Sequence, residues 1–493
     1  MSADVSTVDG AHSAPGVFAA VDIGASSGRV ILGRVGSDGV QLEVIHRFPN
    51  GVVEIDGGLR WNFDALFAEV LEGLRAAATV AAVQGERIVS IGIDTWAVDY
   101  GLVNTAGELT AQPFSYRDDR SRAAVEPVHR KLDPARLYAT TGLQFLQFNT
   151  IYQLAAEKDL DGLQALLIPD LIAFLLTGVR RTEATNASTT GLFDAVAGEW
   201  ATEFLSALGL RRDLFPPLIQ PGETFGTLLP DVSSAVGLPR DTTVVAVGSH
   251  DTASAVAAVP AAADKDGEDF AYISSGTWSL VGLELKHPVL TEASREANFT
   301  NERGVDGTIR YLRNMGGLWL LSECQRTWAQ VGFRPELTSL LTAAAALPPG
   351  GPQINPDDPY FIAPDNMPER IRAAVRRTGD VLTDDPAAIT RCIMDSLAAG
   401  YARTIRDAEK LADRSVDVVH VVGGGSQNQL LCQLTADAAR RPVIAGPVEA
   451  TALGNVLVQA RAAGAVTGGL AELRALVAAG SPLQVFAPQL TRL

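Results

Sequence analysis

The sequence predicts an α/β protein built from two related halves, and three observations support this fold class. The chain has 493 residues, which is more than one hydrophobic core usually serves, so two or three domains are expected. Strand-like and helix-like segments alternate along the chain, a pattern typical of a largely buried sheet flanked by helices. A short unit of strand, glycine-containing loop and strand occurs over residues 18–35 and again over residues 270–285, as two related halves would show.

The first of these units, residues 18–35, reads FAAVDIGASSGRVILGRV. Two β-type runs joined by a tight glycine loop predict a hairpin. The backbone N–H groups of the loop, its two hydroxyls and Arg29 can bind an anion, whereas Asp22 would repel a phosphate unless a divalent cation lies between them. The loop matches neither G-x-x-x-x-G-K-[ST] nor a G-x-G-x-x-G that opens a helix. It indicates Mg²⁺-nucleotide chemistry, and an ordinary surface hairpin is the alternative for this stretch alone.

The second unit, residues 270–285, reads FAYISSGTWSLVGLEL and repeats this layout, with a hydroxyl-rich loop at residues 274–277. Apolar periodicity predicts the other elements. The expected helices are residues 63–78, 163–176 (in two pieces because of Pro169), 387–411 and 429–439. The expected strands are residues 88–94, 242–248 and 416–422. Residues 347–368, rich in Pro and Asp, are expected to form a long irregular loop.

The small and polar segment 259–269, VPAAADKDGED, is the expected boundary between the halves. The expected parts of the chain are a tail of residues 1–15, a first domain of residues 16–258 and a second domain of residues 259–493. The tail has neither the basic nor the apolar region of a signal peptide, so we expect it to be disordered.

Composition narrows the class of protein. Hydrophobic residues make up 47% of the chain and charged residues 20%, which is typical of soluble globular proteins, and no apolar run is long enough to span a membrane. The formal net charge of −17 argues against a nucleic-acid partner, because phosphate backbones need a basic surface. It does not argue against ATP, whose charge can be met locally. Cys324, Cys392 and Cys432 are far apart, so we expect reduced, packed thiols of a cytosolic protein and no metal cluster.

A carboxylate follows directly after the predicted strand 242–248, in the stretch SHDTASAV. Ligands of open α/β sheets gather at the carboxyl ends of strands. There, Asp251 could accept the proton of an attacking hydroxyl, and phosphoryl transfer asks little more of a base. The alternative is that Asp251 caps the following helix, which these residues alone favour. His250 could donate a hydrogen bond to a sugar, although a lone His is more often structural and does not indicate a metal site.

Three other segments offer candidate ligand contacts. Glycines 423–425 lie between a strand and a helix and permit close approach of a flat ring or a ribose, whereas a tight turn normally needs one glycine. Segment 94–100 places Trp96 between two carboxylates at a strand end, where it either stacks on a sugar or is a buried structural residue. The charged segment 116–120 either lines a substrate cleft or forms a solvated ion-pair network, which is the more frequent case.

Eight motifs occur in order between Val21 and Leu431: VDIGASSGRV, GIDTWAVDYGLV, YRDDR, FNTIYQL, SHDTASAV, SSGTWSLVG, LRNMGGLWLL and VVGGGSQNQLL. Together they resemble the FGGY carbohydrate kinases of the actin-like ATPase superfamily, and in particular the branch that acts on L-rhamnulose. The resemblance implies two ribonuclease H-like domains with an interdomain active-site cleft. It also implies ATP- and Mg²⁺-dependent phosphorylation of L-rhamnulose at O1, within L-rhamnose breakdown.

The resemblance also implies roles for individual residues. It places the family's phosphate loop on Ala25, Ser26, Ser27, Gly28 and Arg29, with Asp22 beside the metal. It makes Asp251 the catalytic base and also a sugar-site residue, together with Ala97, His250, Thr252 and Asn314. It places nucleotide contacts on Thr277, Ser322 and Gly425. Ala97 stands where a glycine is expected and Ser322 where a Gln is expected, which leaves fine sugar specificity and nucleotide affinity open.

The expected partners are therefore a small ketose and ATP, with no nucleic acid and no membrane, in a cytoplasmic monomer or homodimer. Closure of the domains should exclude water so that the sugar attacks the γ-phosphate. Two alternatives stay open: a kinase for another ketose such as L-fuculose, and a catalytically silent sugar-binding regulator on the same fold. The presence of Asp22, Asp251 and both loops argues against the regulator, and an ATPase assay with and without ketose separates the two.

Overall fold

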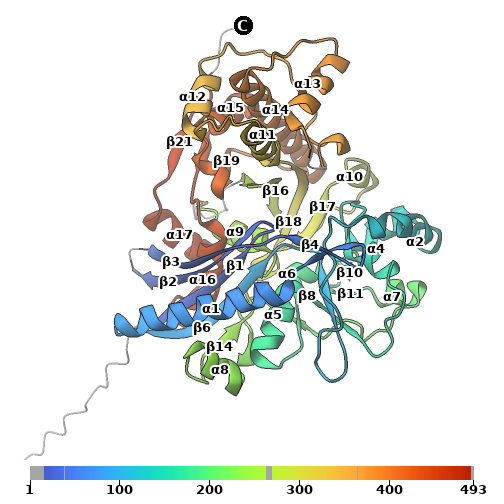
Figure 1. Cartoon of the computed structure of the whole chain (residues 1–493), viewed down its shortest axis with the longest axis vertical. Helices are drawn as coiled ribbons and strands as arrows, with labels where there is room; N and C mark the ends of the chain where they lie inside the picture. The colour runs from blue at the N-terminus through green and yellow to red at the C-terminus, as the bar shows by residue number, and fades with distance from the viewer. Residues whose placement is uncertain (1–15, 38, 262–268, 363–364, 490–493) are drawn as a thin grey trace, which may run out of the picture.

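The computed structural model describes residues 16–37, 39–261, 269–362 and 365–489. Within them the chain forms two large sheets, one in each half, with helices packed on both faces (Figure 1). The expected tail, residues 1–15, lies outside the described residues, and so do residues 262–268 of the expected boundary segment.

The first half is built on a six-stranded sheet with the order β13-β14-β6-β1-β2-β3. Its strands are β13 (Thr224–Thr227), β14 (Thr243–Val245), β6 (Arg87–Thr95), β1 (Gly16–Ile23), β2 (Ser27–Gly36) and β3 (Gly39–Pro49). Strands β1 and β2 form the antiparallel hairpin that the glycine loop predicts, and β3 continues the antiparallel run. On the other side of β1, β6 is parallel to β1 and β14 is parallel to β6.

The second half is built on a seven-stranded sheet with the order β17-β18-β16-β15-β19-β20-β21. Its strands are β17 (Thr300–Arg303), β18 (Ile309–Gly316), β16 (Trp278–Leu285), β15 (Phe270–Ser275), β19 (Val418–Val422), β20 (Val443–Ala445) and β21 (Gln484–Phe486). Here too an antiparallel hairpin, β15–β16, is extended on one side by an antiparallel strand and on the other by two parallel strands. The shared order and strand direction confirm that the two halves are related.

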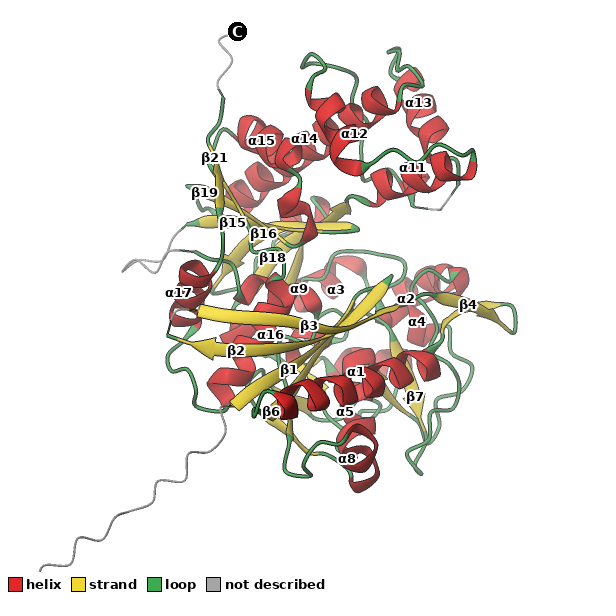
Figure 2. Cartoon of the chain, turned by 60° about the vertical axis from the view of Figure 1, so that its left-hand side comes forward, coloured by secondary structure: helices red, strands yellow, loops and turns green. Residues whose placement is uncertain are grey.

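Helices of both halves pack in layers against these sheets. They are α1 (Phe63–Val83), α5 (Ile168–Thr177), α8 (Pro230–Val236), α9 (Asp251–Ala257), α11 (Trp319–Gln330), α12 (Leu337–Ala345), α13 (Met367–Arg377), α14 (Pro386–Ala412), α15 (Gln429–Ala439), α16 (Ala450–Ala462) and α17 (Leu470–Gly480). Figure 2 shows α1, α5 and α8 beyond the first sheet, α11 to α15 beyond the second, and α9, α16 and α17 between them.

The remaining helices and strands are short. The helices are α2 (Val125–Lys131), α3 (Pro134–Thr141), α4 (Thr150–Ala155), α6 (Ala184–Ala187), α7 (Thr202–Leu208) and α10 (Glu292–Glu296). The paired strands are β4 (Val52–Ile55) with β5 (Gly58–Trp61), β7 (Tyr100–Val103) with β8 (Gln164–Leu167), β9 (Thr182–Glu183) with β12 (Leu218–Ile219), and β10 (Phe193–Asp194) with β11 (Glu199–Trp200). Of these elements, α2, α4, α7, β7 and β8 contribute to a separate hydrophobic cluster.

Strand β1 shows why the central strands of the sheets have continuous apolar sequences. Val17, Ala19 and Val21 face the core that α1 covers, whereas Phe18 and Ala20 pack against α16. Successive side chains of a strand point to opposite faces, so a strand covered on both faces is apolar at every position. Helix α16 belongs to the second half in sequence, yet it packs against β1 and β2 of the first half.

Most predicted elements are confirmed, and one is wrong. The helix expected over residues 63–78 extends to Val83, and residues 429–439 are helical as predicted. Residues 163–176 do split in two, but the first piece is a strand, β8, because it pairs antiparallel with β7. The second piece is helix α5, and Pro169 lies in its first turn, where a backbone N–H has no partner within the helix and proline is tolerated. The strand expected over residues 242–248 is shorter, since only β14 pairs with β6.

The three cysteines are free and buried in α11, α14 and α15, which confirms that they are packed thiols. None of the described helices is both long and apolar enough to cross a membrane.

Candidate active site

The first hairpin places Asp22, at the end of β1, beside Arg29 of β2. Arg29 Nη2 donates a hydrogen bond to Asp22 Oδ2 at 2.7 Å, and Arg29 Nη1 contacts a carboxylate oxygen of Glu449, just before α16. Glu449 comes from the other half of the sequence, and no motif marks it. The arginine of the predicted phosphate loop is therefore held between carboxylates of the two halves.

Residues 24–27 form the turn of this hairpin, and Asn50 holds it in place. The side-chain amide of Asn50 donates to the carbonyl of Gly24 at 2.9 Å, and its backbone N–H donates to the carbonyl of Ser26 at 3.0 Å. At Gly28 a Cβ would lie 2.3 Å from the ring of Phe48, so packing requires glycine there. Ser26 and Ser27 are exposed at the tip of the turn.

Two further carboxylates lie close to Asp22. Asp94 is opposite Asp22 in the parallel pairing of β1 with β6, and Asp251 begins α9. Burial raises the pKa of Asp22, Arg29 opposes this rise, and Asp251 and Glu449 add to it. Burial raises the pKa of Asp94 well above its usual range, and the charges of Asp22 and Asp251 raise it further. Four carboxylates, those of Asp22, Asp94, Asp251 and Glu449, therefore act on the region around Arg29.

This excess of negative charge fits a divalent cation. Within the described part of the chain, Asp94 Oδ1 is buried without a hydrogen-bond partner, whereas its Oδ2 accepts from Asn455 Nδ2 at 2.5 Å. Among the residues that the structure describes, no group of three or more His, Cys, Asp or Glu side chains could hold a metal ion by itself. A Mg²⁺ ion at Asp22 would therefore take most of its ligands from water and phosphate oxygens, as Mg²⁺ does beside nucleotides.

Asp251 lies after the carboxyl end of β14, as predicted, but it does not cap α9. His250 has extended backbone angles and is the N-cap, and Asp251 is the first helical residue. The helix-cap interpretation of Asp251 is therefore wrong. Thr252 Oγ1 donates to Asp251 Oδ1 at 3.0 Å, and the Asp251 side chain is 34% exposed. Asp251 is thus held at the start of a helix with part of its carboxylate open.

Glu183, which no sequence motif marks, fixes the backbone that presents these residues. Its Oε2 accepts from Ser249 Oγ at 2.7 Å, from the Ser249 N–H at 3.1 Å and from Thr185 Oγ1 at 2.6 Å. Burial raises the pKa of Glu183, and the hydrogen bonds from Thr185 and Ser249 lower it in part. The backbone N–H of His250 also lies 3.4 Å from Thr185 Oγ1.

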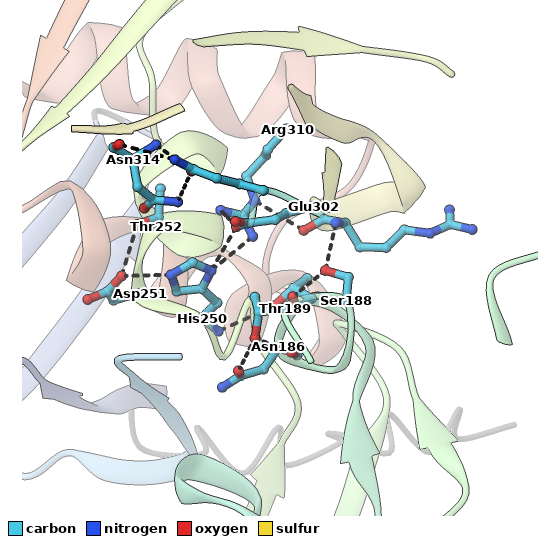
Figure 3. Close-up of polar contacts among 12 residues, drawn as sticks. Asn186, Ser188, Thr189, His250, Asp251, Thr252, Glu302, Arg310 and Asn314 are labelled. Atoms are coloured by element: carbon cyan, nitrogen blue, oxygen red, sulfur yellow. Dashed lines mark hydrogen bonds and ion pairs between the residues drawn. The ribbon is translucent and has the colours of Figure 1, made fainter. Parts of the chain in front are cut away.

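His250 is buried and contacts charged residues on both sides of its ring (Figure 3). Its Nε2 lies 3.6 Å from Asp251 Oδ1. Its Nδ1 lies 3.2 Å from Glu302 Oε2 and 3.1 Å from Arg310 Nη2. Glu302 belongs to β17 and Arg310 to β18, so a side chain of the first half is held by the sheet of the second half.

Asn314 of β18 is held by Gln144, another residue that sequence patterns did not mark. The backbone N–H and the side-chain amide of Asn314 both donate to Gln144 Oε1 at 3.0 Å. Gln144 lies in the first half, after α3, and is buried. Thus His250 and Asn314, both predicted to face the sugar, are each fixed by a residue from the opposite half.

The segment with Trp96 and Ala97 is organised by a buried carboxylate, Asp99. Asp99 Oδ2 accepts from Trp61 Nε1 at 2.7 Å, from Trp96 Nε1 at 3.0 Å and from the Tyr116 N–H at 3.0 Å. Asp99 Oδ1 accepts from Gln153 Nε2 at 2.8 Å. Burial raises the pKa of Asp99 to about 6, although these hydrogen bonds lower it in part.

Trp96 is a structural residue in this arrangement. Its ring packs on Trp61 with centroids 4.2 Å apart, and only 6% of Trp96 is exposed. Next to it, Val98 has φ = 68°, and the Asp99 N–H donates to the Ala97 carbonyl at 2.9 Å across this turn. A β-branched residue in the left-handed region is strained, and such strain is often found where a backbone must take a particular shape at a site. Ala97 is partly exposed on this turn.

The candidate nucleotide residues gather around the second hairpin. Thr277 is exposed in the loop between β15 and β16, and its carbonyl accepts from the Trp319 N–H at the start of α11. Ser322 is exposed one turn further along that helix. At Gly425 a Cβ would lie 2.0 Å from Ser275 Oγ, so its glycine is explained by packing on β15.

The structure gives different reasons for glycine at the positions of this run. Gly423 has φ = 83°, which favours glycine, and Gly425 needs the missing side chain for packing. Of the three, Gly424 is the exposed one, and a side chain there would meet no atom of the described residues within 4 Å of its Cβ.

Two residues of the charged segment 116–120, Asp118 and Arg120, have half-buried partners, so the segment is not a simple solvated network. Arg120 pairs with Glu157 at 2.8 Å and lies over the ring of Phe114, with its guanidinium carbon 3.8 Å from the ring centroid. Asp118 accepts hydrogen bonds from the N–H groups of Leu59 and Arg120 at 2.8 Å. These partners are structural, so the segment supports the loop that carries Tyr116.

Two family models match consecutive parts of the chain. Residues 17–258 match the N-terminal domain, and residues 271–463 the C-terminal domain, of the FGGY family of carbohydrate kinases. The chain belongs to the FGGY family of carbohydrate kinases. This FGGY kinase is similar over nearly its full length to relatives named "Rhamnulokinase". It is 42% identical to the one from Bacteroides thetaiotaomicron and 38% identical to the one from Bacillus subtilis, over 478 residues and 96% of both chains in each case.

Solved structures agree on the fold. The FGGY kinase superposes on a xylulose kinase from Rhodospirillum rubrum with a TM-score of 0.76 at 17% identity, covering 96% of this chain and 94% of the other. It superposes on a Plasmodium falciparum glycerol kinase with ADP with a TM-score of 0.75 at 14% identity, covering 97% of this chain and 94% of the other. The fold is therefore the two-domain fold of these carbohydrate kinases, as the hairpin repeat predicts.

Proposed function

We propose that this FGGY kinase transfers the γ-phosphoryl group of ATP to O1 of L-rhamnulose, giving L-rhamnulose 1-phosphate and ADP in L-rhamnose catabolism. The choice of sugar rests on the relatives named "Rhamnulokinase", which are 38–42% identical to this chain. The choice of chemistry rests on one geometric observation: Asp251 is partly exposed at a helix start, near the loop that holds Asp22 and Arg29.

Asp251 is the proposed base. It accepts the proton of the O1 hydroxyl while O1 forms a bond to the γ-phosphorus, and the bond from that phosphorus to the bridging oxygen of ADP breaks. Because the transition state of phosphoryl transfer is loose, positioning and charge neutralisation contribute more than the strength of the base. Glu183 and Thr252 fix the backbone and the carboxylate of Asp251, which suits such positioning.

Phosphate binding is assigned to the turn Ala25, Ser26, Ser27 and Gly28, with Arg29 behind it. Asp22 would hold Mg²⁺, which when bound neutralises the charge of the phosphates and orients them. Without a cation, the carboxylates near Asp22 would repel ATP, so we expect ATP to bind as its magnesium complex. On the other side, Thr277, Ser322 and Gly425 are the proposed nucleotide contacts.

Sugar binding is assigned to His250, Asp251, Thr252 and Asn314, with Ala97 beside them. The polar side chains can pair with hydroxyls, and Ala97 offers a small apolar surface. Sites built to bind hydroxyls reject analogues that lack them more strongly than apolar pockets reject a change of one methyl group. We therefore expect hydroxyl stereochemistry to matter more than the 6-deoxy methyl group. Since ATP and the sugar are metabolites of the cytoplasm, we expect the enzyme to act there.

The test is an ADP-coupled assay with L-rhamnulose, L-fuculose, D-xylulose and glycerol. The expected order of kcat/KM places L-rhamnulose first and L-fuculose second, with D-xylulose and glycerol poor. Phosphorus NMR of the product should show phosphate on O1. If D-xylulose or glycerol exceeds L-rhamnulose, the assignment of the sugar is wrong although the chain remains a carbohydrate kinase. An absence of ADP release with every sugar would contradict the catalytic proposal.

A further inference from the structure

A buried ion pair of the second half lies directly against His250. Arg310 is fully buried, its Nη1 lies 3.1 Å from Glu302 Oε2, and its Nε donates to the carbonyl of Arg303 at 3.1 Å. Figure 3 shows both side chains reaching His250 from the side opposite Asp251. A buried charge is tolerated only when it is paired, and replacing such a pair with apolar residues is often no less stable.

The contacts of Arg310 decide where the proton of His250 lies. A guanidinium has only N–H donors and keeps its proton in proteins. Arg310 Nη2 lies 3.1 Å from His250 Nδ1 in a hydrogen bond, which Nδ1 has to accept. Glu302 Oε2 also lies 3.2 Å from Nδ1, but within the described residues this oxygen forms no hydrogen bond, so it takes no proton from Nδ1. A neutral imidazole with an accepting Nδ1 carries its proton on Nε2, which is the nitrogen that faces Asp251 Oδ1 at 3.6 Å.

Glu302 supplies the charge that makes this arrangement possible. Burial alone would raise the pKa of Glu302, but the pKa is lowered, and the charge of Arg310 is the largest cause that opposes burial. Glu302 therefore stays ionised and neutralises Arg310 in the interior. The guanidinium is left free to direct one N–H toward the imidazole.

We propose that Arg310 and Glu302 are positioning residues that hold the His250 ring with Nδ1 as acceptor and the proton on Nε2, so that this N–H, beside Asp251, donates to the sugar. The proposal deepens the proposed function and rests on His250 facing the sugar. It also means that the sugar site of the first half is completed by the sheet of the second half. Any movement that separates β18 from His250 would release the imidazole to rotate or change tautomer.

The direct test is the protonation of the ring nitrogens in the wild-type protein. Histidine labelled with ¹⁵N in the ring gives signals for six residues, and the spectrum of His250→Gln identifies those of His250. The expected result is an unprotonated Nδ1 and a protonated Nε2. A protonated Nδ1, either in the other tautomer or in an imidazolium, overturns the proposal. This measurement needs no substrate, so it stands even if the chain proves to act on another sugar.

Variants test whether the pair acts through His250 on sugar binding. Arg310→Met leaves Glu302 buried and unpaired, so the double variant Arg310→Met with Glu302→Gln, which removes both charges, is measured beside it. Loss of a hydrogen bond to a charged group lowers binding affinity by about 10- to 100-fold. In both variants the KM for the sugar should therefore rise by that factor, while the KM for ATP stays unchanged. A mixed tautomer signal from His250 should accompany it.

The matched control is Asp395→Asn, which breaks another buried ion pair, with Arg391 at 2.8 Å in α14. This change should lower thermal stability yet leave the His250 spectrum and the sugar KM as in the wild type. If the folded double variant keeps the wild-type sugar KM, or if Asp395→Asn raises that KM equally, Arg310 and Glu302 have no positioning role.

Discussion

Asp99 should make the stability of this kinase fall as the pH rises through about 6. Burial raises the folded-state pKa of Asp99 from 3.8 to about 6, so the folded protein binds this proton more tightly than the unfolded chain does. The resulting stabilisation is fully present below the unfolded pKa and is lost as the pH rises through the folded pKa. The shift corresponds to about 3 kcal/mol in total, of which about 1.4 kcal/mol should be lost between pH 5 and pH 8.

The assay compares wild type with Asp99→Asn, which keeps the shape of the side chain but cannot titrate. Urea unfolding is followed by tryptophan fluorescence, since Trp61 and Trp96 both donate to Asp99. The difference in unfolding free energy, wild type minus variant, should decrease by about 1.4 kcal/mol from pH 5 to pH 8. In Glu336→Gln, a control, the same difference should stay flat in this range, because hydrogen bonds from Thr338 and Ser339 lower the pKa of Glu336 to about 2. A difference for Asp99→Asn that is flat, or rises with pH, would refute the reasoning.

Three further predictions concern the site itself. Asp22→Ala should raise the Mg²⁺ concentration needed for half-maximal activity by roughly tenfold or more with little change in sugar binding. A Mg²⁺ titration of activity and calorimetry of sugar binding measure the two effects, and an unchanged Mg²⁺ requirement would make Asp22 merely structural. Gln144→Leu removes the acceptor of two hydrogen bonds from Asn314 and should raise the sugar KM by about tenfold without affecting the ATP KM, and an equal rise in both would count against it. Ser322→Gln should lower the ATP KM in steady-state kinetics, and an unchanged value would remove Ser322 from the nucleotide site.

The fold was predictable because its signals are local. The hairpins around Asp22 and Thr277 each show as two apolar runs and a small loop within about twenty residues, and α14 shows its helical period throughout. The strand β8 was mistaken for a helix because a short apolar run has no period of its own. Only its pairing with β7, some sixty residues earlier in the chain, makes it a strand.

The site was predictable only in part, since its supporting residues act across the fold. Asp251 was found because it follows a predicted strand, but Glu183 holds Ser249, two residues before it, from 66 residues away. Gln144 reaches Asn314 across 170 residues, and Arg310 reaches His250 across 60. Nothing near these residues in sequence signals such contacts, because they depend on how the two sheets are placed.

The strained turn at Val98 was also beyond prediction from sequence. Left-handed backbone is expected at glycine, and a valine gives the opposite signal. Val98 lies between Trp96 and Asp99, whose side chains are joined by a hydrogen bond at 3.0 Å, and this contact is not visible in the sequence.

The central claim is that Asp251 takes the proton from the sugar hydroxyl, and the most direct measurement is the turnover of Asp251→Asn with saturating MgATP and L-rhamnulose. The change keeps the size of the side chain and its place at the start of α9, so folding and ATP binding should stay near wild type. General base catalysis contributes about 10²- to 10⁴-fold, and kcat should fall by that factor. A variant that phosphorylates L-rhamnulose at a rate close to wild type would contradict the account.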